Sequence, residues 1–156
     1  MAPIDRTLDV AVAEVRFGAE FGRLNMRVWQ RLDTVLNLLQ VMAGAMALAG
    51  AFSDSKVLAA AGLVMACVSA LQIALQPGRR AADFRMAHAE WQRLAAKAWA
   101  MTLGEVDAKL DDLRASSPDG FDALALPAMN AVNERHGWPA AEQPLGIRQK
   151  LLLAVA

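Results

Sequence analysis

Cysteine and histidine are scarce in this chain of 156 residues, which holds one cysteine, Cys67, and two histidines, His88 and His136. One cysteine cannot form a disulfide within the chain, and a CxxC metal site needs two. The histidines lie far apart in the sequence, with no cluster of cysteines near either one. We therefore expect no disulfide framework and no metal site.

Catalytic motifs are also missing. The sequence contains no GxGxxG, no Walker-type phosphate loop, no HExxH and no GxSxG. Asp111 and Asp112 fall on the polar face of an expected helix, where carboxylates are usually solvated. We expect no enzymatic activity, no catalytic residue and no bound cofactor.

The chain carries no net charge, because 16 Lys and Arg residues balance 16 Asp and Glu residues. Nucleic-acid binding relies on a basic surface, so this balance argues against nucleic acid as a partner. The first fifteen residues hold Asp5, Asp9 and Glu14 and lack the apolar core of a cleavable signal peptide. We expect the chain to enter a membrane through an internal segment.

Charged residues are absent from two long apolar stretches, 35–52 and 57–76. Four polar residues, 53–56, separate them. About 20 residues of helix cross the hydrocarbon core of a bilayer. We therefore predict an all-α membrane protein in which residues 35–76 form a transmembrane helical hairpin. The alternative is a soluble helical assembly with this hairpin in its core, although a core helix normally keeps one polar face that both stretches lack.

The flanking segments are predicted to be helical and cytoplasmic, with residues 1–34 leading into the membrane and 77–156 following it, as one domain overall. Phe84, Trp91 and Ala98 repeat every seven residues, which is typical of a packing seam. We expect this seam to pack on the helix that precedes the first span, or on another chain. Gly104 leaves open whether 79–114 is one helix or two. A short terminal helix is expected over 147–155, docked on the bundle or lying at the membrane interface.

Arginines flank the hairpin, whereas its short loop holds only Lys56 as a basic residue. The flanking arginines are Arg23, Arg27, Arg31, Arg79, Arg80 and Arg85. Because Lys and Arg near the ends of a span favour the cytoplasmic side, both termini are expected in the cytoplasm and the hairpin in the inner, or plasma, membrane. Arg23, Arg27 and Arg31 recur every four residues along one helix face, and we expect them to be solvated or to contact lipid phosphates.

Small residues recur every four positions on one face of each predicted span: Ala43, Ala47 and Ala51 in the first, and Gly62, Ala66, Ala70 and Ala74 in the second. Helices associate in lipid through close packing, which such faces permit. Either both stripes pack the two helices of one hairpin together, or one of them packs between subunits.

Four amide side chains lie in or beside the spans: Asn37, Gln40, Gln72 and Gln76. A buried amide in lipid is costly unless it faces protein or a watery cavity. One interpretation is a hydrogen-bonded clamp between the two helices. The other is a polar ring in an oligomeric pore, which needs several copies because a single hairpin has no lumen.

The order of these features resembles the bacterial SLATT domains, over roughly residues 20–137. The resemblance rests on RVWQRLDTVLNLLQVMAGA (27–45), the very short loop, the break after the second span, RRAADFRMAHAEWQRLAAKA (79–98) and PAMNAVNERHG (127–137). It implies an oligomeric membrane effector that perturbs or permeabilises the inner membrane in a defence or conflict system. It also implies control by a separate nucleotide-generating or sensing protein. The alternative is a non-conducting membrane scaffold whose helices recruit a cytoplasmic partner.

Overall fold

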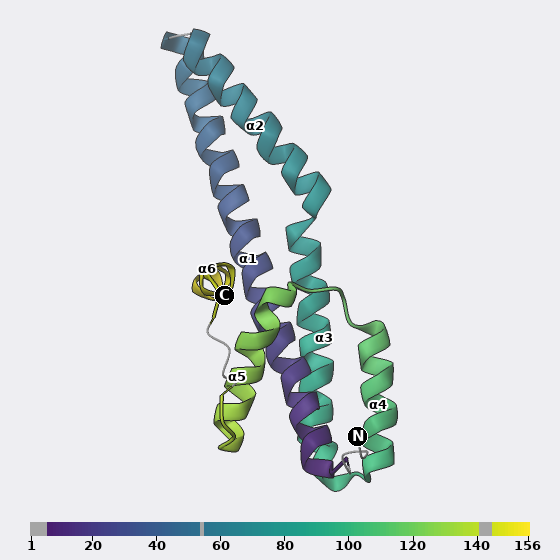
Figure 1. Cartoon of the computed structure of the whole chain (residues 1–156). Coiled ribbons are helices and arrows are strands. Elements are labelled where there is room, and N and C mark those ends of the chain that lie inside the picture. The colour runs from purple at the N-terminus through teal and green to yellow at the C-terminus, as the bar shows by residue number, and fades with distance from the viewer. Residues whose placement is uncertain (1–5, 54, 141–144) are drawn as a thin grey trace. The chain divides into compact units, whose positions relative to one another are not determined.

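A computed structural model describes residues 6–53, 55–140 and 145–156, without the side chains of 51–53. The described residues are all-α and contain no strand (Figure 1), which confirms the predicted fold class. The elements are α1 (Leu8–Ser53), α2 (Ser55–Leu75), α3 (Pro77–Lys97), the 3₁₀ helix η1 (Ala98–Ala100), α4 (Leu103–Ser116), the 3₁₀ helix η2 (Asp122–Leu124), α5 (Ala125–His136) and α6 (Ile147–Val155).

The chain divides into two compact units. The bundle unit comprises residues 1–28 and 81–156, and the hairpin unit comprises residues 29–80. The hairpin unit therefore extends beyond the predicted hairpin, 35–76, at both ends. Its helices reach into the expected loop, because α1 continues to Ser53 and α2 begins at Ser55; Asp54 lies outside the described residues.

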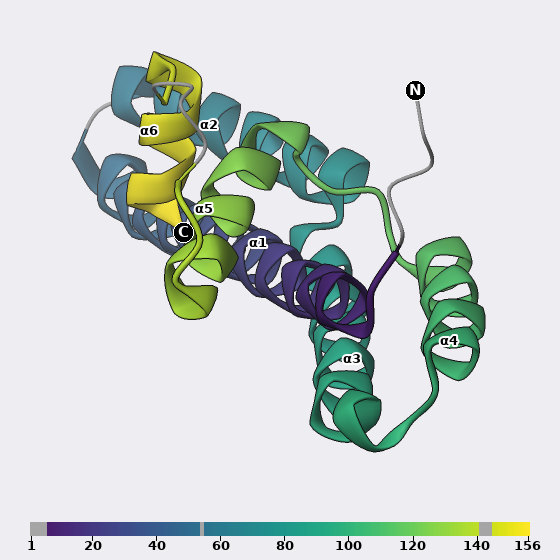
Figure 2. The same cartoon turned by 60° about the horizontal axis from the view of Figure 1, so that its bottom comes forward.

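In the bundle unit, α3 and α4 lie on one side of the first half of α1, and α5 lies on the other (Figures 1 and 2). The first core cluster joins one face of α1 to α3, η1 and α4, through Ala11, Val12, Val15, Ala19, Trp91, Leu94, Ala98, Val106 and Leu110. Trp91 and Ala98 of the predicted seam thus pack on the first half of α1, which is one of the two expected partners.

A second cluster uses another face of α1, where Leu24 and Val28 meet Leu124 and Ala128 of η2 and α5. The C-terminal Ala156 is buried here, and Leu152 of α6 packs against the cluster. The terminal helix spans 147–155 as predicted, and it docks on the bundle.

Local sequence signals explain where the bundle helices begin and end. The backbone N–H and hydroxyl of Thr102 both donate to Oε2 of Glu105, at 2.8 Å each, and this cap starts α4. Residues 79–114 therefore form two helices. The same two hydrogen bonds, the backbone one first, hold the pKa of Glu105 below its usual value. Gly137 ends α5 with φ of 69°, a left-handed cap that glycine adopts without strain.

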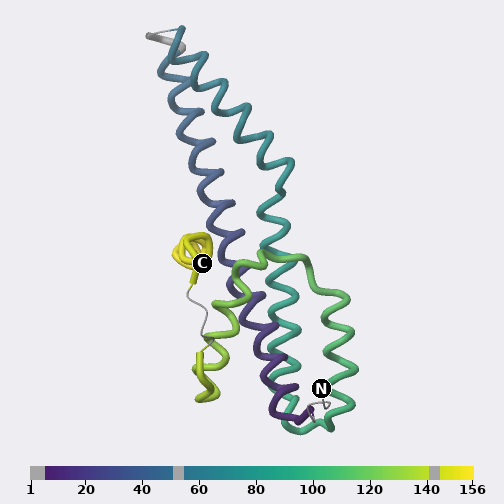
Figure 3. Tube along the Cα trace, viewed as in Figure 1, coloured from purple at the N-terminus to yellow at the C-terminus, as the bar shows by residue number. Residues whose placement is uncertain are grey.

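In the hairpin unit, α1 and α2 run antiparallel, as the trace in Figure 3 shows. The helix α2 ends at Leu75, Gln76 takes a left-handed φ of 45°, and Pro77 starts α3. Proline suits the first helical position because its missing N–H needs no partner there. The predicted break after the second apolar stretch is confirmed.

Candidate functional site

Two helices are long and apolar enough to cross a membrane. Stretches of 18 residues in Leu8–Gly50 and Ser55–Ala100 reach mean hydropathies of 1.5 and 2.2. Only 11% of each stretch is buried within the structure. A core helix of a soluble chain would be mostly buried, so this surface needs either lipid or other chains to cover it.

Many large apolar side chains of the hairpin unit are exposed. Those more than half exposed are Val35, Leu38, Val41, Met42, Met46, Leu48, Leu63 and Ile73. They come from both helices, α1 and α2. The hairpin unit therefore presents apolar surface outward.

The two hairpin helices bury few residues, and those nearest the turn are small. Leu36, Ala43 and Gly50 are buried at seven-residue intervals in α1, as are Ala61 and Val68 in α2. A Cβ added to Gly50 would lie 2.8 Å from the backbone nitrogen of Leu58, so the helices touch backbone to backbone near the turn. Heptad spacing on both helices is typical of this packing.

The two predicted stripes of small residues have different environments. In the first, Ala43 is buried and Ala47 half-buried, while the side chain of Ala51 lies outside the described residues. The whole second stripe, Gly62, Ala66, Ala70 and Ala74, is exposed. A Cβ added to Gly62 would meet no atom within 4 Å. The second stripe is therefore not used within the hairpin.

Two of the four predicted amides meet. Nε2 of Gln72 donates to Oδ1 of Asn37 at 2.9 Å, and Nδ2 of Asn37 donates to Oδ2 of Asp33 at 3.2 Å. We call Asp33, Asn37 and Gln72 the hairpin polar cluster. Gln40 takes no part in it, and Gln76 lies at the break, where its Oε1 accepts from Nη1 of Arg79 at 3.4 Å.

Asp33 is the member of this cluster that sequence reasoning missed. It lies four residues before Asn37, a spacing that places the two side chains on one helix face and was the available signal. A Cβ added to Gly78 would lie 3.3 Å from Oδ1 of Asp33, so this carboxylate lies at the first turn of α3. A helix N-terminus favours negative charge, and Asp33 therefore links the start of α3 to α1.

The flanking arginines fall into two groups. Arg27, Arg31, Arg79, Arg80 and Arg85 are exposed. The guanidinium of Arg80 lies 4.8 Å from the centre of the Trp29 ring, a cation–π contact in the hairpin unit. Arg23 is instead half-buried in the bundle unit, in a two-point ion pair with Glu20.

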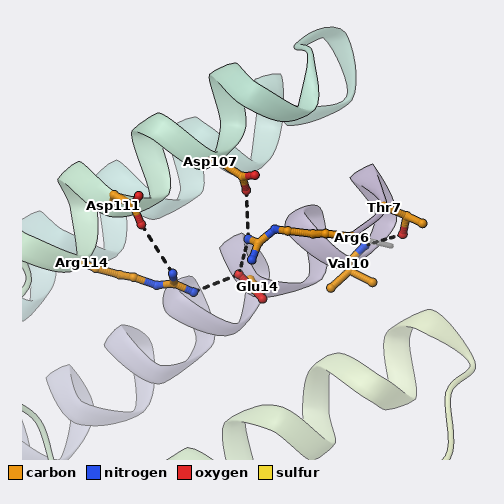
Figure 4. Close-up of polar contacts among 7 residues, drawn as sticks. All are labelled: Arg6, Thr7, Val10, Glu14, Asp107, Asp111 and Arg114. Carbon is orange, nitrogen blue, oxygen red and sulfur yellow. Dashed lines mark hydrogen bonds and ion pairs between the residues drawn. The ribbon is translucent and has the colours of Figure 1, made fainter. Parts of the chain in front are cut away.

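Ion pairs also hold α4 to the start of α1 (Figure 4). Oε2 of Glu14 accepts from Arg6 at 2.7 Å and from Arg114 at 2.9 Å, and Arg6 also contacts Asp107 at 2.9 Å. These side chains are a third or more exposed, so each pair contributes little. Asp111, expected to be solvated, is exposed and lies 3.7 Å from Arg114.

Among the described residues, no three His, Cys, Asp or Glu side chains are grouped to hold a metal ion. Comparisons with protein-family models, curated proteins and solved structures found no match.

Proposed function

We propose that this chain is an oligomeric membrane effector that perturbs or permeabilises the inner membrane of a bacterium. The observation that carries the proposal is the exposed apolar surface of the hairpin unit. Only 11% of each 18-residue apolar stretch is buried within the structure. The effector role in a defence or conflict system follows from the resemblance to SLATT domains. A separate nucleotide-generating or sensing protein is the partner that this resemblance implies.

Oligomerisation is part of the proposal because two helices enclose no lumen. The exposed stripe of Gly62, Ala66, Ala70 and Ala74 gives α2 a face on which a second hairpin can approach closely. The arginines on both sides of the hairpin support an orientation with both termini in the cytoplasm.

The test is inducible expression in bacteria together with a dye that reports membrane potential, followed by particle counting in detergent. We expect depolarisation, arrested growth and particles with several copies of the chain.

The control pair is Leu63→Arg and Met86→Arg, at positions 68% and 62% exposed in α2 and α3. Arginine at the centre of a span makes the free energy of membrane insertion less favourable by roughly 2.5–3.5 kcal/mol. The Leu63→Arg variant alone should therefore be lost from the membrane fraction and fail to depolarise the cells. Unchanged potential and growth, with the chain in the membrane and its trigger present, would refute the effector role.

A non-conducting membrane scaffold is the second candidate. The observation in its favour is that Asn37 and Gln72 bond to each other across the hairpin, as a clamp does, and do not need a watery lumen. Replacing both residues with leucine should leave recruitment by a scaffold intact and should abolish conduction through a polar ring. The dye experiment repeated on this double variant separates the two candidates.

A further inference from the structure

A cavity of about 270 Å³ opens on the surface of the bundle unit and is lined by residues of α1, α3 and α5. Arginines outnumber carboxylates among the side chains that line it. The polar side chains that line it are Arg16, Glu20, Arg23, His88, Gln92 and Arg135. Three arginines against one glutamate leave two positive charges, without counting the histidine.

Glu20 fixes two of these arginines in place. Its side chain is 5% exposed, and its Oε2 accepts from Nε of Arg23 at 3.1 Å while Oε1 accepts from Nη2. Nη2 of Arg135 lies 3.6 Å from the same Oε2. Burial by itself raises the pKa of Glu20, but the hydrogen bond from Arg23 and the charges of Arg23, Arg135 and His88 outweigh it, so the pKa lies below its usual value. The carboxylate is thus ionised and anchors the arginines.

In the described part of the chain, Arg16 contacts a histidine and no acidic side chain. Its Nη1 donates to Nε2 of His136 at 3.1 Å, and a guanidinium can only donate, so this ring nitrogen accepts. Among the described residues, no carboxylate lies within ion-pair distance of Arg16. Its charge at the cavity is therefore uncompensated.

We propose that this cavity binds a small anion that carries phosphate groups. Guanidinium groups present paired donors that match phosphate oxygens, and arginine remains charged at any physiological pH. The two excess charges match a doubly charged phosphate better than a single carboxylate. The volume lies just below the usual range of roughly 300–1,000 Å³ for small-molecule sites, which favours a compact ligand. The lining side chains come from α1, α3 and α5, so the bound anion ties these three helices together.

The experiment uses the full chain in zwitterionic detergent, with pyrophosphate and inorganic phosphate as soluble probes in calorimetric titrations. A parallel arm adds phosphatidylglycerol to the micelles and measures whether it competes with pyrophosphate, which distinguishes a free phosphate compound from a lipid headgroup. Binding should be saturable, weaken with salt and raise the unfolding temperature of the bundle. Saturable binding in either arm supports the proposal and identifies the source of the phosphate.

The variants are Arg16→Gln and Arg135→Gln, with Arg85→Gln as the control on the exposed surface of α3. Loss of one charge-assisted contact should weaken binding roughly tenfold or more, whereas the control should bind as the unchanged chain does. Arg135 is 61% exposed, so its replacement should leave the fold intact by circular dichroism. Absence of saturable binding in both arms, or an equal loss in Arg85→Gln, would overturn the proposal.

Discussion

The two halves of α1 show how differently one helix can use apolar residues. In the bundle unit, Ala11, Val12 and Val15 are completely buried. In the hairpin unit, Leu38 and Val41 are 57% and 71% exposed. Apolar surface in the first half is removed from water by neighbouring helices, while in the second half the chain itself leaves it uncovered. The bundle unit therefore buries apolar side chains of α1 among its own helices, whereas the hairpin unit leaves many of them exposed.

Polar groups follow the same division. In the bundle unit, ion pairs join α1 to its neighbours: Glu20 pairs with Arg135 of α5, and Glu14 pairs with Arg114 of α4. In the hairpin unit, α1 and α2 are joined instead by the hydrogen bond that the side-chain amide of Gln72 donates to that of Asn37. Each of the following substitutions tests whether stability comes from a packed interior in one unit and from backbone proximity and amide pairing in the other.

The largest effect is expected from Trp91→Ala in the bundle unit. Trp91 is 6% exposed, packs in the first core cluster and donates from Nε1 to Oγ of Ser117 at 3.0 Å. Gly18 lies against its ring so closely that an added Cβ would be 2.6 Å away. Removing such a side chain costs roughly 3–5 kcal/mol of unfolding free energy. Thermal unfolding in detergent measures the loss.

Trp99→Ala is the matched control, because Trp99 is 52% exposed. It should unfold close to the temperature of the unchanged chain. Equal destabilisation by the two substitutions would show that the bundle unit does not depend on its buried seam.

The second effect is expected at the tip of the hairpin, from Gly50→Ala. The added Cβ would lie 2.8 Å from the nitrogen of Leu58, so the two helices must separate there. Overpacking of this kind costs about 1–3 kcal/mol. Gly62→Ala is the control, since its Cβ meets nothing within 4 Å and both changes gain the same helix propensity. Cysteine cross-linking across the hairpin should drop for Gly50→Ala alone; equal cross-linking in both variants would refute the close approach.

Much of this division could be predicted from the sequence. The two charge-free stretches, the break at Pro77 and the seven-residue seam of Phe84, Trp91 and Ala98 are local patterns, and each corresponds to an element of the structure. It was harder to predict which of the amide side chains form a hydrogen bond with each other. Gln40 and Gln76 look like Asn37 and Gln72 in sequence, and only the rotation of one helix against the other selects the pair that bonds.

The same reason explains what sequence reasoning missed. Glu20 carries no motif, and its importance comes from Arg135, which lies more than a hundred residues away in the chain. Arg23 was grouped with the membrane-flanking arginines by spacing alone, whereas the fold turns it toward Glu20. Such contacts depend on which helix faces pack, and composition does not determine that.

Acid should weaken the bundle unit through Glu20. Because its pKa is lowered in the folded state, Glu20 adds stability that is complete above about 4.5, the usual pKa of a glutamate, and that is lost as the pH falls through the folded value. The unfolding temperature should therefore fall below about pH 4.5. A Glu20→Gln variant should lack this part of the pH dependence. If both proteins show the same acid profile, the ion pairs of Glu20 do not stabilise the bundle unit.

The smallest effect is expected from the hairpin polar cluster. Hydrogen bonds between helices in a membrane contribute about 0.6 kcal/mol on average, so the coupling between Asn37 and Gln72 should be of that order. A double-mutant cycle with Asn37→Leu, Gln72→Leu and both together measures it by unfolding in mixed micelles. Either single change leaves an amide without its partner, so the double variant should be less destabilised than the two singles added together.

A second cycle with Gln40→Leu and Gln72→Leu should show no coupling, because those amides do not form a hydrogen bond with each other. Equal coupling in the two cycles would mean that all the amides share one polar environment, as in a ring of several hairpins, and would contradict the clamp.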